Sequence, residues 1–529
     1  MSPGTSNEGQ IELFSDRLEW LGSAGLEAAL RAGLRGVEKE TLRVDAHGRL
    51  AQTPHPPGCG SPLTHPQITT DYSEALLELV TPPLAGTWQT LQQLCDIHAF
   101  VYRHIGEESL WPMSMPCELA GDASIPIADY GASNRGMFRT IYRRGLGHRY
   151  GRAMQAIAGV HFNYSPPVDF WPIYQQAQRD AAPQHVFRSQ AMMSLVRNYY
   201  RHAWLVIYLF GASPALSRSF LPDGNELLQP LDSKTWFAPF ATSLRMSDLG
   251  YQNRSQARIR IGANSLEEYI RGLTEAVTSL EPKYEQIGVL VDGDYRQLNA
   301  NRLQIENEYY STIRPKPPAS SERTTIGLRE HGVEYVEVRT LDLSPADPVG
   351  LNQAQMRFLE VLLLYCLLCD SPPISAAEQR EITARDLVTA RDGRRPGVEL
   401  PFDGGVQTVM TLAAGMSTPL LELAGLLDEN DRGPYESSVR AALAACKEPE
   451  STPSARVLAA LQDAGVSFLE YGRDVAAANR RYFLEMPLAP EQRAQQERRA
   501  ATSLREAAEL EAADNEPFAD YLARFMKRV

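Results

Sequence analysis

The chain has 529 residues, of which 43% are hydrophobic and 22% charged, and its formal net charge at pH 7 is −13. These proportions are those of a globular protein with a large core, and the acidic balance argues against a nucleic-acid binder, which would carry a basic surface. Six cysteines are too few for a disulfide scaffold. The N-terminal stretch lacks the basic and apolar regions of a signal peptide. The apolar segment 203–217 is shorter than the roughly 18 residues of a membrane span. We therefore expect a soluble, cytoplasmic protein that binds neither nucleic acid nor membrane.

A helical lead-in is expected over residues 11–33, followed by a short strand from Gly36 to Val44. Glu38 and Glu40 share one face of this strand, with their Cα atoms about 7 Å apart at ~3.3 Å per residue. On an exposed edge strand the two carboxylates would be solvated and would have no function. In a cleft they would need a cation.

The segment 68–82 adds Asp71, Glu74 and Glu78. Their spacing fits an exposed helical face, but residues 77–81 have the character of a strand in which Glu78 stands between apolar neighbours. A buried Glu of this kind needs a partner.

Helices are expected over 87–107, 133–150, 188–216 and 265–280. The second is dense in arginine, which suits either a polyphosphate ligand or a solvated basic face. Between them, segment 159–165 predicts a strand with His161 and Asn163 on its polar face. Arg245, in a polar segment, suits either a carboxylate clamp or a surface salt bridge.

Two further strands are expected, at 303–310 with Glu306, Glu308 and Tyr310 on one face, and at 333–343 with Glu337 and Arg339 on one face. Residues 313–316 are expected to open a Pro/Ser-rich loop, either a mobile lid or a plain linker. The remaining chain is expected to be helical over 352–369, 417–428, 434–446, 454–464, 467–485 and 489–512. Cys366 and Cys369 lie in an apolar run, which favours two core thiols over a metal site.

Together these strands predict a sheet whose concave polar face is a binding site. Carboxylate and imidazole groups favour Mg²⁺ or Mn²⁺ over Zn²⁺. The sequence has no glycine-rich phosphate loop, so a bound nucleotide would be held by metal ions and by Arg or Lys side chains. No nucleophile motif is persuasive.

Nine ordered segments resemble the bacterial monofunctional glutamate–cysteine ligases (γ-glutamylcysteine synthetases). They are residues 36–44, 68–82, 111–117, 159–165, 209–215, 241–251, 304–310, 313–316 and 333–339. The resemblance is dense from about residue 35 to 345, thins through the helical C-terminal third, and returns at 511–518. It implies an α+β, glutamine-synthetase-like fold in which an antiparallel sheet forms a funnel-shaped site surrounded by helices. It also implies a single catalytic unit over 1–529, with a sheet-bearing core at 35–345 and a mainly helical part at 350–529.

The resemblance implies the ATP-dependent joining of the γ-carboxylate of L-glutamate to the amine of L-cysteine through γ-glutamyl phosphate. This reaction gives γ-glutamylcysteine, ADP and phosphate, and it opens glutathione biosynthesis. ATP is the co-substrate, Mg²⁺ or Mn²⁺ the metal, and a monomer is expected. The implied metal ligands are Glu38, Glu40, Asp71, Glu78, His161 and Glu337.

The resemblance assigns the remaining site residues to three tasks. The implied glutamate clamp is Arg245. The implied catalytic residues are Arg245 and Arg339. The implied nucleotide contacts are Arg339, Arg314 and Lys316. The implied wall around cysteine consists of Tyr72, Tyr142, Leu146, Tyr251 and Tyr310. Position 72 is often Phe in this family, and segment 254–265 departs from the family pattern.

Three rival hypotheses remain open at this stage. One is a ligase for a different amine acceptor, and another is a phosphotransferase resembling the guanidino kinases. The third is a metal-binding or regulatory protein without catalysis, which loss of a metal carboxylate would favour, yet every matching carboxylate is present.

Overall fold

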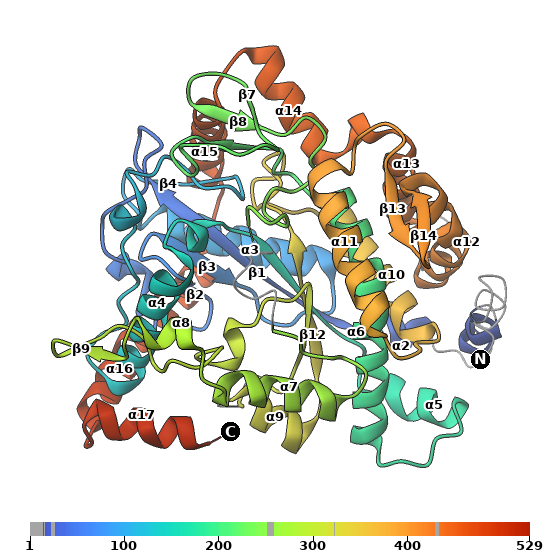
Figure 1. Ribbon diagram of the computed structural model, residues 1–529, viewed down its shortest axis with the longest axis horizontal. Helices are drawn as coiled ribbons and strands as arrows, with labels where there is room; N and C mark the ends of the chain where they lie inside the picture. The colour runs from blue at the N-terminus through green and yellow to red at the C-terminus, as the bar shows by residue number, and fades with distance from the viewer. Residues whose placement is uncertain are drawn as a thin grey trace.

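The computed structural model describes residues 14, 16–22, 27–250, 259–321, 323–428 and 433–528. A seven-stranded antiparallel sheet lies at its centre (Figure 1). The strand order is β11-β12-β5-β1-β3-β2, and β4 pairs with the end of β1. The strands are β1 (Leu34–Val44), β2 (Ile68–Thr70), β3 (Leu76–Val80), β4 (Ser109–Leu110), β5 (Val160–Ser165), β11 (Ile313–Lys316) and β12 (Tyr335–Leu341).

Helices surround this sheet and dominate the second half of the chain (Figure 1). The longer helices are α3 (Thr87–Tyr102), α4 (Asn134–Tyr150), α6 (Gln184–Phe210), α7 (Leu266–Thr278), α10 (Gln353–Leu368), α11 (Ala376–Asp392), α12 (Val409–Leu427), α13 (Pro434–Lys447), α14 (Pro453–Ala464), α15 (Phe468–Glu485), α16 (Pro490–Ala513) and α17 (Phe518–Lys527). The shorter ones are α2 (Glu27–Arg31), α5 (Phe170–Ala177), α8 (Pro282–Glu285) and α9 (Thr324–His331). Smaller sheets are formed by β6 (Ala215–Ser217) with β8 (Thr235–Phe237) and β7 (Gln229–Pro230), by β9 (Leu290–Val291) with β10 (Asp294–Tyr295), and by β13 (Glu399–Phe402) with β14 (Gly405–Thr408).

The two faces of β1 have opposite chemistry because side chains alternate along a strand. Val37 and Lys39 point toward the helices, where Lys39 Nζ lies 2.8 Å from His98 Nε2 of α3. Burial lowers the pKa of Lys39 to about 7. Glu38 and Glu40 therefore point to the opposite side of the sheet.

A buried ion pair joins the helix-covered face of the sheet to the C-terminal helices. The Arg35 side chain of β1 contacts Glu360 of α10, and their exposures are 1% and 0%. Tyr435, in the first turn of α13, donates a hydrogen bond to the same carboxylate at 2.8 Å. This cluster fixes β1 to helices that lie more than three hundred residues later in the sequence.

The structure confirms the strands expected around Glu38, Glu78, His161 and Glu337, and it corrects two other predictions. Residues 303–310 do not form a strand, since Glu306–Glu308 are a 3₁₀ turn (η4). Residues 313–316 are an edge strand, not the start of a loop. Helices α11 and α17 and the β13–β14 hairpin were not predicted.

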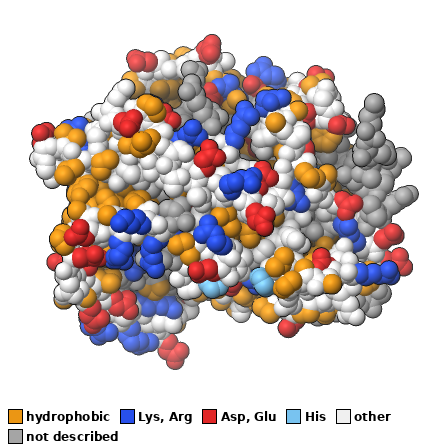
Figure 2. Space-filling model, turned by 60° about the horizontal axis from the view of Figure 1, so that its bottom comes forward, with side chains coloured by type: hydrophobic (Ala, Val, Ile, Leu, Met, Phe, Trp, Pro, Cys, Tyr) orange, Lys and Arg blue, Asp and Glu red, His pale blue; other side chains and the backbone are white. Residues whose placement is uncertain are grey.

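The surface carries both signs of charge. On the face drawn in Figure 2, acidic and basic side chains are interspersed, so the net negative charge is not gathered into one patch there. Among the described helices, α12 has the length and composition of a membrane span. A helix in the core of a protein can have the same length and composition, and α12 contains Pro419 and packs closely against α13.

The Arg35–Glu360 pair gives the first testable prediction. Replacing Glu360 by Gln would leave the Arg35 guanidinium buried without its counter-charge, so we expect a loss of about 3–5 kcal/mol in the free energy of unfolding. Chemical denaturation monitored by circular dichroism measures this loss. The exposed Glu330→Gln substitution is the matched control, and equal stabilities of the two variants would contradict the role assigned to the pair.

Candidate active site

The acidic residues predicted from the sequence meet on the open face of the sheet because of the strand register. Glu40 of β1 stands directly opposite Glu78 of β3. Glu38 stands opposite His161 of β5, and Glu337 of β12 stands opposite Asn163. Four neighbouring strands therefore deliver carboxylate, imidazole and amide groups to one surface.

A tight group lies at the centre of this surface. One ligand atom from each of Glu38, His161 and Glu337 lies within 4.8 Å of the others. His161 Nδ1 is 3.1 Å from Glu38 Oε2, and Asn163 Nδ2 donates to Glu38 Oε1 at 2.9 Å. His161 Nε2 has no hydrogen-bond partner and lies 3.7 Å from Glu40 Oε1.

These contacts fit a divalent cation bound by oxygen and nitrogen ligands. In the tautomer with its proton on Nδ1, directed at Glu38, His161 would have the Nε2 lone pair available to a metal ion. The Glu337 Oε2 atom is buried and has no hydrogen-bond partner, as expected of a ligand oxygen. The residues present therefore fit Mg²⁺ or Mn²⁺, which favour carboxylate oxygens with at most a few imidazoles.

The carboxylates differ in how their charge is stabilised. Burial and the nearby Glu38, Asp71 and Glu40 raise the pKa of Glu78 well above its ordinary value. Burial and Asp71 likewise raise the pKa of Glu40, although His161 opposes the shift. Without a cation, the part of the site around Glu40 and Glu78 favours protonated carboxyl groups.

The opposite holds at Glu337, where cations surround the carboxylate. Arg339, Lys316 and Arg314 lie 3.4, 3.5 and 3.6 Å from its oxygens. Burial alone would raise the pKa of Glu337, but Lys316 and the two guanidinium groups lower it well below its ordinary value. A phosphate arriving at this end of the site would meet positive charge already in place.

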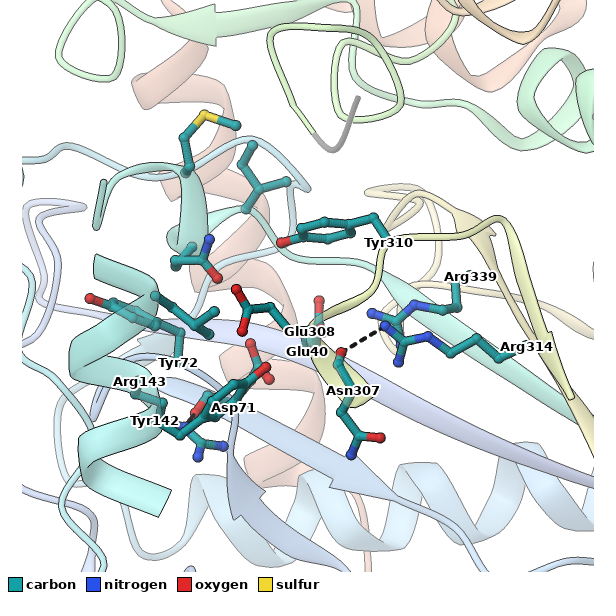
Figure 3. A pocket seen from close by; sticks show the side chains of 14 residues that line it. Glu40, Asp71, Tyr72, Tyr142, Arg143, Asn307, Glu308, Tyr310, Arg314 and Arg339 are labelled. Atoms are coloured by element: carbon teal, nitrogen blue, oxygen red, sulfur yellow. Dashed lines mark hydrogen bonds between the residues drawn. The ribbon is translucent and has the colours of Figure 1, made fainter. Parts of the chain in front are cut away.

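A cavity of about 70 Å³, open to solvent, adjoins this surface. Four residues predicted to contact cysteine line it, namely Tyr72, Tyr142, Leu146 and Tyr310, together with Glu40, Asp71, Arg314 and Arg339. Figure 3 shows Glu40, Asp71 and Glu308 in the middle, Tyr72 and Tyr142 on one side and the two arginines on the other. The cavity therefore has an aromatic wall beside an acidic floor and a basic edge.

Helix α4 brings the aromatic wall to the sheet. Its N-terminus is capped by Ser133, whose Oγ accepts a bond from the Gly136 amide at 3.1 Å. The i,i+4 spacing places Tyr142 and Leu146 on one side of the helix. Gly145 and Gly147 leave room for neighbours, since a Cβ at Gly147 would lie 2.4 Å from the Tyr72 hydroxyl.

Arg245 is fully buried and does not line the cavity. Its guanidinium donates to the Arg339 carbonyl at 3.0 Å and lies 3.8 Å from Asp342. It crosses Gly159 so closely that a Cβ there would lie 2.1 Å from Arg245 Nη2. The glutamate-clamp role of Arg245 stays a prediction, and Tyr251 lies outside the described residues.

Sequence reasoning did not assign site roles to Arg143, Asn307 or Glu308, which also line the cavity. Glu308 accepts hydrogen bonds from Arg149 at 3.0 Å and Tyr150 at 2.6 Å. Arg314 donates to the Asn307 carbonyl at 2.9 Å, which attaches the η4 turn to the sheet edge. Two features of the sequence could have indicated a site role for Arg143. They are the many arginines in 133–150 and its position next to Tyr142.

Comparisons with known proteins agree on one family. The family model for glutamate–cysteine ligase matches residues 18–388. The glutamate–cysteine ligases of Alcanivorax borkumensis and Azotobacter vinelandii are each 45% identical to this chain, over 97% and 98% of it and 99% of each relative. The crystal structure of glutamate–cysteine ligase from Francisella tularensis in complex with AMP superposes with a TM-score of 0.88 at 32% identity, covering 94% of this chain and 98% of that one.

The opposed carboxylates generate a prediction for the metal-free protein. Replacing Glu78 by Gln removes the repulsion with Glu40, so in EDTA we expect the free energy of unfolding to rise by about 1 kcal/mol. Because the native pKa of Glu78 is raised, its contribution to stability is lost as the pH rises, and the gain from Gln should be larger at pH 8 than at pH 5.

Thermal unfolding with and without Mg²⁺ provides the measurement. In the unsubstituted protein Mg²⁺ should raise the melting temperature, and Glu78→Gln should reduce that increase. Glu334→Gln, at an exposed position beside β12, is the control that changes charge alone. A Glu78→Gln variant that is less stable than the parent in EDTA at both pH values would contradict the repulsion argument.

Proposed function

The chain belongs to the glutamate–cysteine ligase family, and from this premise we propose that its acidic site joins L-glutamate to L-cysteine at the expense of ATP. The observation that carries the proposal is the continuity of the site. A solvent-open cavity lined by tyrosines opens directly onto a carboxylate and imidazole surface edged by guanidinium groups. Relatives of nearly the same length favour this reaction over the guanidino-kinase-like and non-catalytic hypotheses.

The first chemical problem is to bring two anions together. An oxygen of the glutamate γ-carboxylate must attack the γ-phosphorus of ATP, and ADP must leave with the electrons of the broken P–O bond. Arg339, Arg314 and Lys316 stand where they would neutralise the phosphates and hold them for in-line transfer. The implied ligands Glu38, Glu40, Asp71, Glu78, His161 and Glu337 would hold Mg²⁺, which would supply positive charge to offset that of the phosphates.

The second problem is to keep γ-glutamyl phosphate away from water until the amine arrives. The nitrogen of cysteine attacks the acyl carbon, phosphate leaves, and the amine loses a proton. Tyr72, Tyr142, Leu146 and Tyr310 would hold cysteine beside this carbon and cover its approach from solvent. No protein nucleophile is needed, which agrees with the absence of such a motif in the sequence.

We further propose that residues 1–529 act as one catalytic unit, a cytoplasmic monomer. The buried Arg35–Glu360 pair supports a single unit, because it ties the core region of 35–345 to the helices that follow residue 350. Size-exclusion chromatography with light scattering would distinguish a monomer from larger assemblies.

ADP release in the presence of Mg²⁺ tests the proposed reaction. The assay compares ATP alone, ATP with glutamate, and ATP with glutamate plus either cysteine or another amino acid. Mass spectrometry then identifies the product. If glutamate together with an amine acceptor does not stimulate ADP release, the ligase proposal fails. If another amino acid is used in preference to cysteine, the acceptor is corrected and the ligase chemistry stands.

Replacing Glu38 by Gln tests the metal shell. We expect turnover to fall by at least about a hundredfold, since one charged ligand is lost while the hydrogen bond from Asn163 can be kept. Circular dichroism should show an unchanged fold, and Glu334→Gln should retain activity. A Glu38→Gln enzyme with near-normal turnover would remove Glu38 from the metal shell.

Replacing Tyr142 by Ala tests the aromatic wall. Loss of this contact should raise the KM for cysteine by about tenfold or more, because burying an aromatic side chain contributes roughly 1.5–3 kcal/mol. The KM for ATP should stay within about twofold, which serves as the internal control. An equal rise in both constants would show that Tyr142 supports the whole site and not the cysteine pocket.

A further inference from the structure

A second cavity of about 320 Å³ lies beyond the β2 edge of the sheet, apart from the residues that line the active-site cavity. Its walls come from the loop before β2, from the start of α4 and from α16. The residues that carry its chemistry are His65, Arg135, Arg139 and Glu506. The proposed reaction assigns no task to any of them.

His65 presents a hydrogen-bond donor that nothing satisfies. The side chain is 6% exposed, and its Nδ1 accepts hydrogen bonds from the amides of Gln67 at 3.1 Å and Ile68 at 2.8 Å. These two bonds fix the tautomer, so the proton must be on Nε2. Nε2 is buried and has no partner among the described residues. A buried N–H of this kind calls for an acceptor.

Two guanidinium groups line the same cavity. Arg135 and Arg139 are four residues apart on α4 and therefore share one side of the helix. Neither side chain forms a hydrogen bond or an ion pair with another residue in the described parts of the chain. Burial, with Arg143 and Arg135 adding to it, lowers the pKa of Arg139 despite the opposing effects of Tyr130 and Glu78. Arg139 is thus a partly buried cation that stacks over the Tyr130 ring and makes no direct ion pair among the described residues.

The remaining polar groups of the cavity do not supply enough negative charge to balance the two guanidinium groups. The Thr64 and Thr69 hydroxyls donate to the carbonyls of Ser503 and Pro62 at 2.6 Å each. Glu506 is the one carboxylate in the cavity wall and is exposed, against two guanidinium groups and the His65 donor. The cavity therefore offers donors from separate directions to a ligand that is rich in acceptor oxygens.

We propose that this cavity binds a phosphate group, either as free phosphate or as the monoester of a small metabolite. A single carboxylate is satisfied by one guanidinium fork, whereas a tetrahedral phosphate has oxygens for both forks and for the imidazole donor. His65 contributes as a neutral donor, since burial and Arg499 lower its pKa to about 4. The site is separate from the proposed active site and its occupancy does not depend on the ligase reaction.

The test uses the full chain in EDTA at constant ionic strength, with inorganic phosphate as the probe and calorimetric titration as the measurement. Arg135→Gln and Arg139→Gln should each weaken binding about tenfold or more, the loss expected for a hydrogen bond to a charged group. His65→Asn should also weaken it, because Asn can still accept the backbone amide bonds but has lost the Nε2 donor. Arg135→Gln alters an exposed side chain, so its effect cannot be attributed to misfolding.

Two control variants distinguish binding in this cavity from a general effect of surface charge and from binding in the active-site cavity. Arg498→Gln removes the same charge from an exposed position on α16 outside the cavity, and it should bind phosphate as the parent does. Arg339→Gln should leave this binding unchanged, since Arg339 belongs to the active-site cavity. Loss of binding in Arg339→Gln alone, or an equal loss in Arg498→Gln and Arg135→Gln, would overturn the proposal.

Titrations with two other ligands identify the source of the phosphate group. Glycerol 3-phosphate binding tenfold or more tighter than inorganic phosphate would assign the site to a monoester, and equal or weaker binding would assign it to free phosphate. Malonate binding as tightly as phosphate would overturn the assignment of a phosphate group. Turnover of Arg135→Gln, measured in parallel, should match the parent if the ligase reaction is independent of this site.

Discussion

The direct opposition of Glu40 and Glu78 across β1 and β3 is the constraint on which the site depends. Like charges at paired positions destabilise a sheet, and burial adds to the cost. Two kinds of group on the neighbouring strands can offset this negative charge. The His161 imidazole on one side can bind a cation, and the guanidinium groups around Glu337 on the other side are themselves cations. A structure that tolerates this arrangement gives up stability for a site that can hold divalent cations.

The electrostatics divide the site into two ends. Around Glu78 and Glu40 the raised pKa values mark an excess of negative charge, where metal ions are needed. Around Glu337 the lowered pKa marks an excess of positive charge, where phosphates can bind. The aromatic cavity is lined by Glu40 and Asp71 from the acidic end and by Arg314 and Arg339 from the basic end, so a molecule bound in it would lie next to both.

How far the sequence could predict the site depends on which contacts are local. The alternation of Glu38 and Glu40, of His161 and Asn163, and of Glu337 and Arg339 predicted the strands and the shared face, because period-two patterns record the side that each residue occupies. The same pattern misled at 303–310. There Glu308 accepts hydrogen bonds from the Arg149 side chain and from the Gln304 amide, and these bonds favour a turn. Because Arg149 lies 159 residues away in the sequence, no local pattern could reveal its bond.

Pairings between distant segments also explain the elements that were missed. Helix α17 packs Phe518 and Leu522 against Phe138 and Ile141 of α4, a contact that no local pattern announces. Arg323 is likewise buried through bonds to Glu306 and to the carbonyls of Phe525 and Arg528. The metal, glutamate and nucleotide roles came from the family resemblance and remain predictions. The phosphate cavity was accessible only from the structure, because the tautomer of His65 follows from bonds made by its fold.

The two-faced character of β1 has a consequence for how this protein can evolve. Insertion or deletion of one residue within the strand would move the following side chains to opposite faces. Glu40 would then enter the helix-covered core, and Lys39 would enter the acidic face. Neither face could compensate, because each is paired with fixed partners on several other strands and helices. Lineages of this protein should therefore accept length changes in their surface loops while the length of β1 stays constant.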